Sequence, residues 1–464
     1  MKRTKIVATI GPSTNSVEIV ENLIRSGLDV ARLNFSHGDY KQHSEYIDNV
    51  RKASKKLSKP IAILQDLSGP KIRVGNLDES INLAFGDELF IVKDKSRYED
   101  KKNAVGISYP EIIDELVVGQ NLSMADGLIR LVIKERDKDH VKCEVLNGGV
   151  LSSRKGINFP YFDPNIKSFT EKDMADLVFG VGKGVDIVAV SFVRNAKDIL
   201  DVKEYIKKLG GRQPVFAKIE KQSALENIFE ILEVADGIMV ARGDLGVETD
   251  MEKVPVIQKQ LIKSAIEHGK PVITATQMLT SMINSPIPTR AEVSDVANAI
   301  LDGTDAVMLS DETTIGKYPL ECISTLTKII KETEKIYEFY RKPLRTDEDS
   351  AIAYAANILA RDIDAKGIVV FTRSGKSAER VSRYRPKCPV YVNTTDERTA
   401  RRLSVNWGLQ NSFILKEFQN VEEMIMEFLL QAEARKIKKE RDTFVAVFGN
   451  SFKRENSTNS IVLI

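Results

Sequence analysis

The chain has 464 residues, which is more than one hydrophobic core normally organises, so roughly two to four domains are expected. A hydrophobic content of 42% and a charged content of 29% are typical of a soluble globular protein. The 68 lysines and arginines nearly balance the 66 aspartates and glutamates, and no apolar run reaches membrane-spanning length, which argues against nucleic acid or a membrane as partner. The three cysteines lack CxxC spacing, which predicts a reducing, cytoplasmic location and no structural zinc.

Short apolar runs rich in β-branched residues recur along the first three quarters of the chain, with amphipathic stretches between them. These runs lie at 5–11, 30–36, 61–66, 186–192, 215–220, 237–243, 272–277 and 306–311. Strands that are apolar on both faces belong to parallel sheets covered by helices, and eight of them can close a (β/α)8 barrel. An open doubly wound sheet is the alternative, but no GxGxxG motif follows the first run. We therefore expect an α/β protein with a (β/α)8 TIM barrel over residues 1–69 and 168–342.

The regular spacing of these runs is interrupted once, between the third and the fourth. Residues 70–167 contain alternating runs and Gly-centred turns with little helical periodicity. This pattern predicts a small β-barrel domain of antiparallel strands, inserted at the end of the TIM barrel that carries catalytic loops. A lid that excludes water is its expected role.

A second α/β unit is expected over residues 343–464. The polar stretch at 341–350 has the composition of a linker, and four further apolar runs follow it. They lie at 367–372, 390–394, 444–449 and 461–464. The chain is therefore expected to form three domains.

The segments FAKIE (216–220) and VARGDLG (240–246) are the most informative part of the sequence. Side chains two apart on a strand project to the same side, so Lys218 and Glu220 present an ammonium and a carboxylate together. Asp244 follows the next apolar run, where a loop would leave the sheet. A cation and two acids at adjacent strand ends are suited to binding a divalent metal beside an anionic substrate. The alternative for each residue is a salt bridge at a strand end.

Other strand ends also carry polar residues. They are Arg32, Asn34, Ser36 and His37 in or just after the second run, Asp66, Lys71 and Arg73 at the end of or after the third, Gly243 before Asp244, and Thr276 at the seventh. An arginine can bind a phosphate with two hydrogen bonds, and a glycine lets backbone amides approach an anion. The structural alternative for Arg32 is an ion pair at the barrel rim, and for His37 it is a hydrogen-bonded loop histidine. For Gly243 the alternative is a glycine in a tight turn.

Taken in order, several motifs are together similar to those of pyruvate kinase. They are TKIVATIGP, ARLNFSHG, KIE, MVARGDLG, ATQML, PTRAEVSDVANAILDG and MLSDET, and the likeness extends over almost the whole chain. The resemblance implies transfer of a phosphoryl group from phosphoenolpyruvate to ADP, giving ATP and pyruvate. Such a transfer needs positioned cations more than a nucleophile.

The resemblance also implies roles for single residues. Glu220 and Asp244 would hold Mg²⁺ (or Mn²⁺), and Lys218 would stabilise charge during the transfer. Arg32 would contact the phosphoryl group, and Gly243, Asp244 and Thr276 would bind the substrate carboxylate. Asn34, Ser36, His37, Arg73 and, from the lid, Lys155 would approach the nucleotide, with Asp126 reaching in upon lid closure. A homotetramer is the oligomer that the resemblance implies.

Two departures from the family's pattern stand out. This chain has GPK at 69–71 where many members have GPE, whose glutamate marks dependence on potassium. The resemblance implies a monovalent-cation site built by Asn34, Ser36, Asp66 and the Leu67 carbonyl. The Lys71 ammonium would supply that positive charge internally, so we expect activity without potassium. The lid junction at 161–173 also departs from the family's common DLPxxTEKD, which affects the hinge.

The segment TRSGKSAER (372–380) follows an apolar run and begins a predicted helix. Backbone amides with Ser374, Lys376 and Ser377 could bind a phosphate there, and the family uses this place for phosphorylated effectors. A plain helix start is the alternative.

Two other functions compete with an active kinase: a different barrel enzyme acting on enolates, and a catalytically divergent phosphoenolpyruvate-binding protein serving as an effector sensor. The presence of Lys218, Glu220 and Asp244 favours the kinase.

Overall fold

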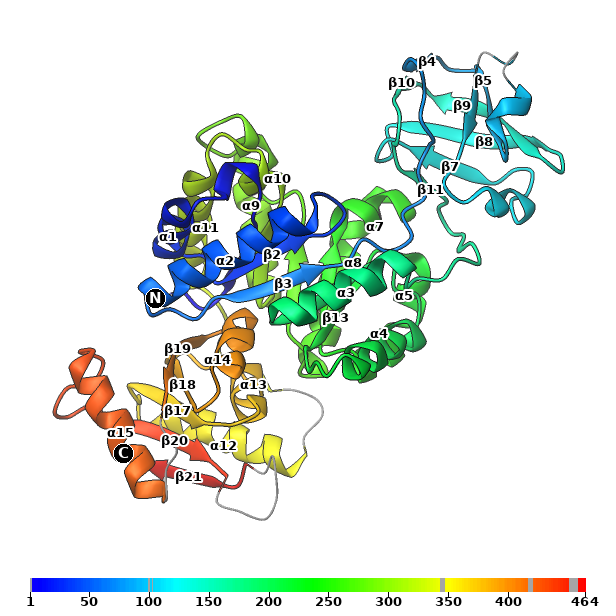
Figure 1. The fold of residues 1–464 in the computed structure, drawn as a ribbon. Helices are drawn as coiled ribbons and strands as arrows, with labels where there is room; N and C mark the ends of the chain where they lie inside the picture. Colours follow the sequence, from blue (N-terminus) through cyan, green and yellow to red (C-terminus); the bar gives the residue numbers. More distant parts are fainter. Residues whose placement is uncertain (1, 99–100, 102, 343–346, 416–419, 450–457) are drawn as a thin grey trace.

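The computed structural model describes residues 2–98, 101, 103–342, 347–415, 420–449 and 458–464. The chain forms a central barrel, a β domain that projects from one end of it, and an α/β domain at the opposite end (Figure 1).

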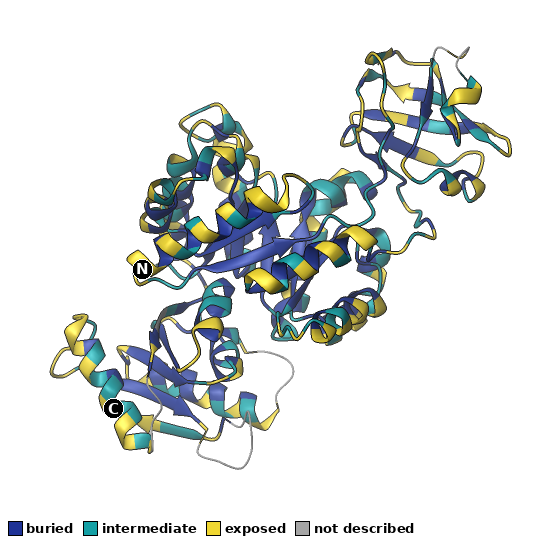
Figure 2. Ribbon diagram, in the orientation of Figure 1, coloured by how far each residue is buried: buried dark blue, intermediate teal, exposed yellow. Residues whose placement is uncertain are grey.

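Eight parallel strands close the central barrel, as expected. In chain order they are β1 (Lys5–Thr9), β2 (Val30–Asn34), β3 (Ala62–Asp66), β12 (Ile187–Val190), β13 (Val215–Ile219), β14 (Gly237–Ala241), β15 (Val272–Ala275) and β16 (Ala306–Leu309). The barrel closes because β1 pairs with both β2 and β16. Each strand is short and almost wholly buried, and the barrel strands are coloured as buried in Figure 2. All eight expected strands are confirmed.

Amphipathic helices surround the strands. They are α1 (Val17–Ser26), α2 (Tyr40–Lys56), α3 (Glu171–Lys183), α4 (Ala196–Lys208), α5 (Gln222–Glu226), α6 (Ile228–Val234), α7 (Arg242–Glu248), α8 (Val254–Glu267), α9 (Arg290–Asp302), α10 (Asp311–Thr314) and α11 (Pro319–Thr333). The first amphipathic stretch forms α1, which the Ser16 hydroxyl caps at its start and Gly27 follows at its end. Helix α3, which follows the lid, begins with a capping box between Thr170 and Asp173.

The inserted domain contains a six-stranded sheet in the order β11-β7-β8-β9-β5-β6 and a separate pair, β10-β4. The strands are β4 (Ile81–Leu83), β5 (Glu88–Val92), β6 (Ala104–Gly106), β7 (Asn121–Met124), β8 (Ile129–Arg136), β9 (His140–Asn147), β10 (Gly149–Leu151) and β11 (Ile157–Asn158). The domain has its own apolar core. Its pairs are antiparallel as expected, except that β5 and β6 are parallel. The domain stands away from the barrel (Figure 1).

The C-terminal domain contains a five-stranded sheet in the order β19-β18-β17-β20-β21, with β21 antiparallel at one edge. Its strands are β17 (Gly367–Phe371), β18 (Val390–Thr394), β19 (Leu409–Ile414), β20 (Phe444–Phe448) and β21 (Ser460–Leu463). Its helices are α12 (Glu348–Asp362), α13 (Lys376–Arg383), α14 (Glu397–Arg402), the short 3-10 helix η6 (Leu403–Val405) and α15 (Val421–Ala434). Residues 343–346 of the expected linker lie outside the described residues.

The C-terminal domain packs against the amino-terminal ends of the barrel strands. Arg385 pairs with Asp305 at 2.8 Å, and the Trp407 amide donates to the same carboxylate at 3.0 Å. Val405 is buried in one apolar cluster with side chains that fill the interior of the barrel, such as Val7 and Met239. The barrel interior is therefore closed at this end by a residue of another domain.

None of the helices in the described part of the chain has the length and apolar character of a membrane span.

Candidate active site

Lys218 lies at the centre of a buried cluster at the carboxyl ends of the barrel strands. Its ammonium is 2.8 Å from Glu220 Oε1 and 3.2 Å from Asp66 Oδ1, and it donates a hydrogen bond of 2.6 Å to Ser191 Oγ. Burial alone would lower the pKa of Lys218, but the carboxylates of Asp66, Glu220 and Asp244 outweigh it and raise the pKa above its usual value. These carboxylates therefore favour the positively charged form of the side chain.

Glu220 and Asp244 form the acid pair that the sequence predicts. Oε2 of Glu220 accepts the Phe192 amide at 2.8 Å, and its buried Oε1 is paired with the Lys218 ammonium. Burial, with a further contribution from Asp244, raises the pKa of Glu220 even though Lys218 opposes the rise. Asp244 lies in the first turn of α7 and is partly exposed.

These two carboxylates suit a magnesium ion. Magnesium usually takes one or two protein carboxylates and fills its remaining positions with water and substrate oxygens. Among the described residues, no cluster of three or more acids, histidines or cysteines suited to a metal occurs. To bind a metal, Oε1 of Glu220 would have to share its negative charge with the Lys218 ammonium.

Arg32 on β2 is oriented by two neighbours. Its Nε donates to Asp66 Oδ2 at 2.7 Å, and one terminal nitrogen donates to Thr9 Oγ1 at 2.8 Å. Burial raises the pKa of Asp66, but Lys218 and Arg32 outweigh it and lower the pKa below its usual range. Asp66 is thus an ionised bridge between two cations.

Thr276 occupies an unusual backbone conformation just after β15. Its φ is +67° and that of Gln277 is +55°, in the left-handed region that β-branched residues rarely adopt. The Thr276 hydroxyl accepts the Gly243 amide at 2.9 Å and donates to the Ala275 carbonyl at 2.7 Å. The structure thereby brings together Thr276 and the Gly243–Asp244 turn, as the sequence analysis expected of a carboxylate-binding group.

Arg242 is a residue that the sequence analysis missed. It is buried at the start of α7, and its guanidinium donates to the main-chain carbonyl of Thr276 at 2.6 Å. Arg242 lies inside the VARGDLG motif, so the sequence shows its position. Its partner, Thr276, is 34 residues away, so the sequence does not show the contact.

The groups expected to bind a monovalent cation already have partners. Oδ1 of Asn34 accepts the Ser36 amide at 3.1 Å, and the Leu67 carbonyl accepts the Ser191 hydroxyl at 2.7 Å. Asp66 is paired with Arg32 and Lys218, as described above. The Lys71 ammonium is 3.8 Å from Asp244 Oδ1, so the lysine lies beside the acid pair.

Residues expected to approach a nucleotide come from both barrel and lid. Burial lowers the pKa of His37, and the nearby charges of Arg73 and Lys71 lower it further, so the imidazole is neutral at pH 7. Arg73 donates to the Arg154 carbonyl at 3.0 Å, next to the exposed Lys155. Asp126 is exposed in a left-handed turn of the lid.

The expected effector loop contains a tight turn before α13. Gly375, with φ of +79°, donates its amide to the Thr372 hydroxyl at 2.9 Å. Lys376 is exposed, but Ser377 is buried and its hydroxyl is 2.6 Å from that of Thr458. Of the expected phosphate-binding side chains, Ser377 therefore already contacts the final segment of the chain.

The closed (β/α)8 barrel, its buried cations and its acid pair define a metal-assisted enzyme that stabilises negative charge at its strand ends. A family model described as "Pyruvate kinase, barrel domain" matches residues 1–323, and one described as "Pyruvate kinase, alpha/beta domain" matches residues 350–464. The chain belongs to the pyruvate kinase family, whose members are phosphotransferases acting on phosphoenolpyruvate and ADP to give pyruvate and ATP.

Two relatives show the extent of the likeness. "Pyruvate kinase 2" of Synechocystis sp. (strain ATCC 27184 / PCC 6803 / Kazusa) is 46% identical over 421 residues, covering 89% of this chain and 71% of the relative. "Pyruvate kinase" of Staphylococcus aureus (strain USA300) is 45% identical over 419 residues, covering 88% and 71% respectively. The family generally requires Mg²⁺, which agrees with the open acid pair.

Proposed function

We propose that this chain catalyses the pyruvate kinase reaction with Lys218, Glu220 and Asp244 at its centre. The observation that carries the proposal is the buried Lys218 ammonium, 2.8 Å from Glu220 and 3.2 Å from Asp66. Glu220 and Asp244 would hold Mg²⁺ or Mn²⁺, which supplies Lewis-acid stabilisation of developing negative charge when bound. Lys218, whose positive charge the neighbouring carboxylates favour, stabilises the phosphoryl group in transit and the enolate that it leaves behind.

Neighbouring groups orient the substrate in this proposal. The guanidinium of Arg32, held by Asp66 and Thr9, contacts the phosphoryl group. The Thr276 hydroxyl and the amides of Gly243 and Asp244 bind the carboxylate, for which the hydroxyl and the Gly243 amide exchange their present hydrogen bonds. Nucleotide contacts come from Asn34, Ser36, His37 and Arg73 beside the barrel and from Lys155 and Asp126 of the lid. The lid stands away from the barrel, so lid closure is required to bring the last two to the nucleotide (Figure 1).

The direct test is pyruvate formation from phosphoenolpyruvate, ADP and Mg²⁺ by the full chain. Turnover that disappears in the Lys218→Met variant supports the proposal. The alternative function, a divergent effector sensor, predicts phosphoenolpyruvate binding by calorimetry without turnover.

The proposal includes independence from potassium, because the Lys71 side chain places its amino group 3.8 Å from Asp244 Oδ1. The wild-type enzyme should have similar kcat/KM with potassium and with tetramethylammonium as the only monovalent cation. Lys71→Glu should lower activity in tetramethylammonium and restore it with potassium. Lys93→Glu, which breaks a lid ion pair with Asp114, is the matched control and should not introduce a potassium response. A Lys71→Glu variant indifferent to potassium would refute this part of the proposal.

Three further features belong to the same proposal and rest on membership of the family. The enzyme is cytoplasmic, it is a homotetramer, and a phosphorylated effector binds at residues 372–377. Because the Ser377 hydroxyl contacts Thr458, an effector there would have to displace or share that contact. Light scattering tests the tetramer, and activity assays with sugar phosphates and nucleoside monophosphates test the effector.

A further inference from the structure

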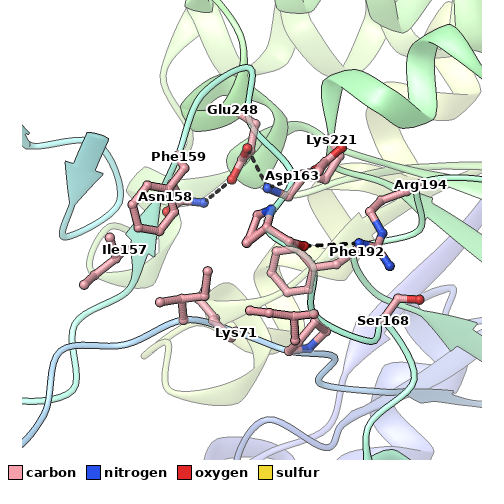
Figure 3. Close-up of a pocket in the computed structure, with 14 residues that line it drawn as sticks. Lys71, Ile157, Asn158, Phe159, Asp163, Ser168, Phe192, Arg194, Lys221 and Glu248 are labelled. Atoms are coloured by element: carbon pink, nitrogen blue, oxygen red, sulfur yellow. Dashed lines mark hydrogen bonds and ion pairs between the residues drawn. The ribbon is translucent and has the colours of Figure 1, made fainter. Parts of the chain in front are cut away.

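A cluster of polar side chains, two of them buried and two partly buried, lies where the lid returns to the barrel, outside the site described above. It contains Asn158, Asp163, Lys221 and Glu248, called here the hinge cluster (Figure 3). Asn158 belongs to the lid strand β11, and Asp163 to the following segment, which departs from the family's common sequence. Lys221 and Glu248 belong to the barrel.

Direct contacts join the two sides of the hinge cluster. The Lys221 ammonium is 3.0 Å from Glu248 Oε2 and 3.5 Å from Asp163 Oδ1. The Asn158 side-chain amide donates to the other Glu248 oxygen, Oε1, at 2.7 Å. Lys221 is 8% exposed and Glu248 2% exposed, so the charges cannot exchange these partners freely for water.

The two barrel members of the hinge cluster, Lys221 and Glu248, lie close in sequence to the proposed metal ligands. Lys221 directly follows Glu220 in the chain. Glu248 is the last residue of α7, and Asp244 lies in the first turn of the same short helix. The lid's return strand is therefore held by side chains on the same backbone segments that carry the acid pair.

The hinge segment borders a small pocket. This pocket, of about 40 Å³, lies beside the hinge cluster. Its apolar lining includes Ile72 and Ile157 from the lid and Phe192 from the barrel. Within the pocket wall, the Pro164 carbonyl accepts the Arg194 guanidinium at 3.3 Å (Figure 3). Directional contacts and the burial of Ile157 and Phe159 in the lid core thus both hold this segment.

We propose that Lys221 and Glu248 are positioning residues that set the orientation of the lid over the active site. Asn158 and Asp163 are the lid's side of this contact. Breaking this contact leaves Glu220 and Asp244 in place. The lid residues proposed to reach the nucleotide, Lys155 and Asp126, then take many positions. Misplacement by about 1 Å can cost about a hundredfold in rate, so a modest loosening is sufficient to slow transfer to ADP. This inference rests on the proposed function.

The test compares two reactions of the same enzyme. Phosphoryl transfer to ADP needs the closed lid, whereas exchange of pyruvate methyl protons for deuterium, with Mg²⁺ and inorganic phosphate, needs only the barrel groups that stabilise the enolate. For Asn158→Ala and Asp163→Asn, kcat/KM for transfer should fall by about tenfold or more, with exchange changed less than about twofold. Hydrogen exchange of segment 157–168 should become faster. Asn103→Ala, which removes a hydrogen bond to the Glu88 carbonyl within the lid, is the matched control and should change neither reaction.

The barrel side of the contact is tested with Glu248→Gln, alone and combined with Asn158→Ala. The two substitutions act on one hydrogen bond, so the double variant should lose much less than the product of the single losses. Lys203→Gln removes an ion pair of 2.8 Å with Asp236 at the other end of the barrel strands and should leave transfer unchanged.

Particular results overturn the inference. They are equal loss of exchange and transfer in Asn158→Ala, which would place the defect in the acid pair, and unchanged transfer in both lid-side variants. A wild-type protein that performs neither reaction would instead refute the proposed function itself. Thermal unfolding of each variant shows whether it is folded, and only folded variants enter the comparison.

Discussion

Arg242 fixes the main chain of Thr276 by three hydrogen bonds that converge on adjacent carbonyls. Its guanidinium donates to the Thr276 carbonyl at 2.6 and 3.2 Å and to the Ala275 carbonyl at 3.3 Å. Asp295 holds the remaining nitrogen at 2.7 and 2.8 Å. Left-handed conformations of ordinary residues cost on the order of 1–3 kcal/mol each and persist only where the surroundings impose them. Arg242 is therefore the group that keeps the Thr276 hydroxyl aimed at Gly243.

Replacing Arg242 by lysine should lower kcat about tenfold to a hundredfold. Lysine keeps the charge but cannot reach two carbonyls and Asp295 at once, so the strained turn relaxes and the carboxylate-binding groups move apart. Steady-state kinetics with phosphoenolpyruvate as the varied substrate measures the effect. The exposed Arg212→Lys is the control. Unchanged kinetics in a folded Arg242→Lys variant would show that Thr276 holds its conformation without the guanidinium.

Replacing Glu220 by glutamine should weaken divalent-metal binding at least about tenfold and lower kcat about a thousandfold. Glutamine retains an oxygen to accept the Phe192 amide, so the fold should persist. Binding of Mn²⁺, followed by electron paramagnetic resonance, measures the first effect without requiring turnover. The exposed Glu230→Gln serves as control, since Glu230 accepts only the Ala196 amide among the hydrogen bonds of the described residues. Normal Mn²⁺ affinity in Glu220→Gln would exclude Glu220 as a ligand.

Lys5 should make stability depend on alkaline pH. Burial, only partly offset by Asp29, lowers the pKa of Lys5 from 10.5 to about 8. Between these two values the unfolded chain binds more protons than the native protein, so the free energy of unfolding rises with pH. Below about pH 8 the full penalty, roughly 3 kcal/mol, is present.

Urea unfolding of wild-type protein and Lys5→Met at pH 7.5, 8.5 and 9.5 measures this contribution. The free energy of unfolding of the wild type should rise relative to that of Lys5→Met over this pH range. The exposed Lys183→Met variant should show the same pH dependence as the wild type. Parallel curves for wild type and Lys5→Met would mean that Lys5 does not change protonation on unfolding in this window.

Shortening Val405 to alanine should destabilise the protein by about 1–3 kcal/mol without changing kcat. Val405 is 2% exposed and fills the end of the barrel interior opposite the active site, so the lost methyl groups leave a cavity. The urea midpoint measures the loss, and Val256→Ala at an exposed position should leave it unchanged. A kcat that fell with stability would reveal coupling between the two ends of the barrel.

The sequence was sufficient to predict the barrel and the polar strand ends, because both depend on local pattern. The alternation of apolar runs and helices placed all eight strands, and strand parity brought Lys218 and Glu220 to one side. The terminal position of Asp66 was also correct, although the structure gives it a role as a bridge between Arg32 and Lys218.

Contacts between distant segments could not be predicted from the sequence. Arg242 meets Thr276, and Asn158 meets Glu248, only because the barrel closes and the lid returns to it. No periodicity encodes which side chains then meet. The parallel pairing of β5 and β6 is similar, since an alternating pattern is the same in both strand directions. The sequence departure at 161–173 marked the hinge as unusual without indicating its contacts.

Val405 also affects how the protein can be divided. In chain order the barrel ends well before this residue, yet the apolar layer at its amino-terminal mouth includes it. In a fragment containing only residues 1–342, that apolar layer would be exposed to water and Asp305 would lose its ion pair with Arg385. A fragment cut at the linker should therefore be less stable than the full chain. Exchange of the C-terminal domain between relatives would have to carry over the η6 segment and its fit to the recipient barrel.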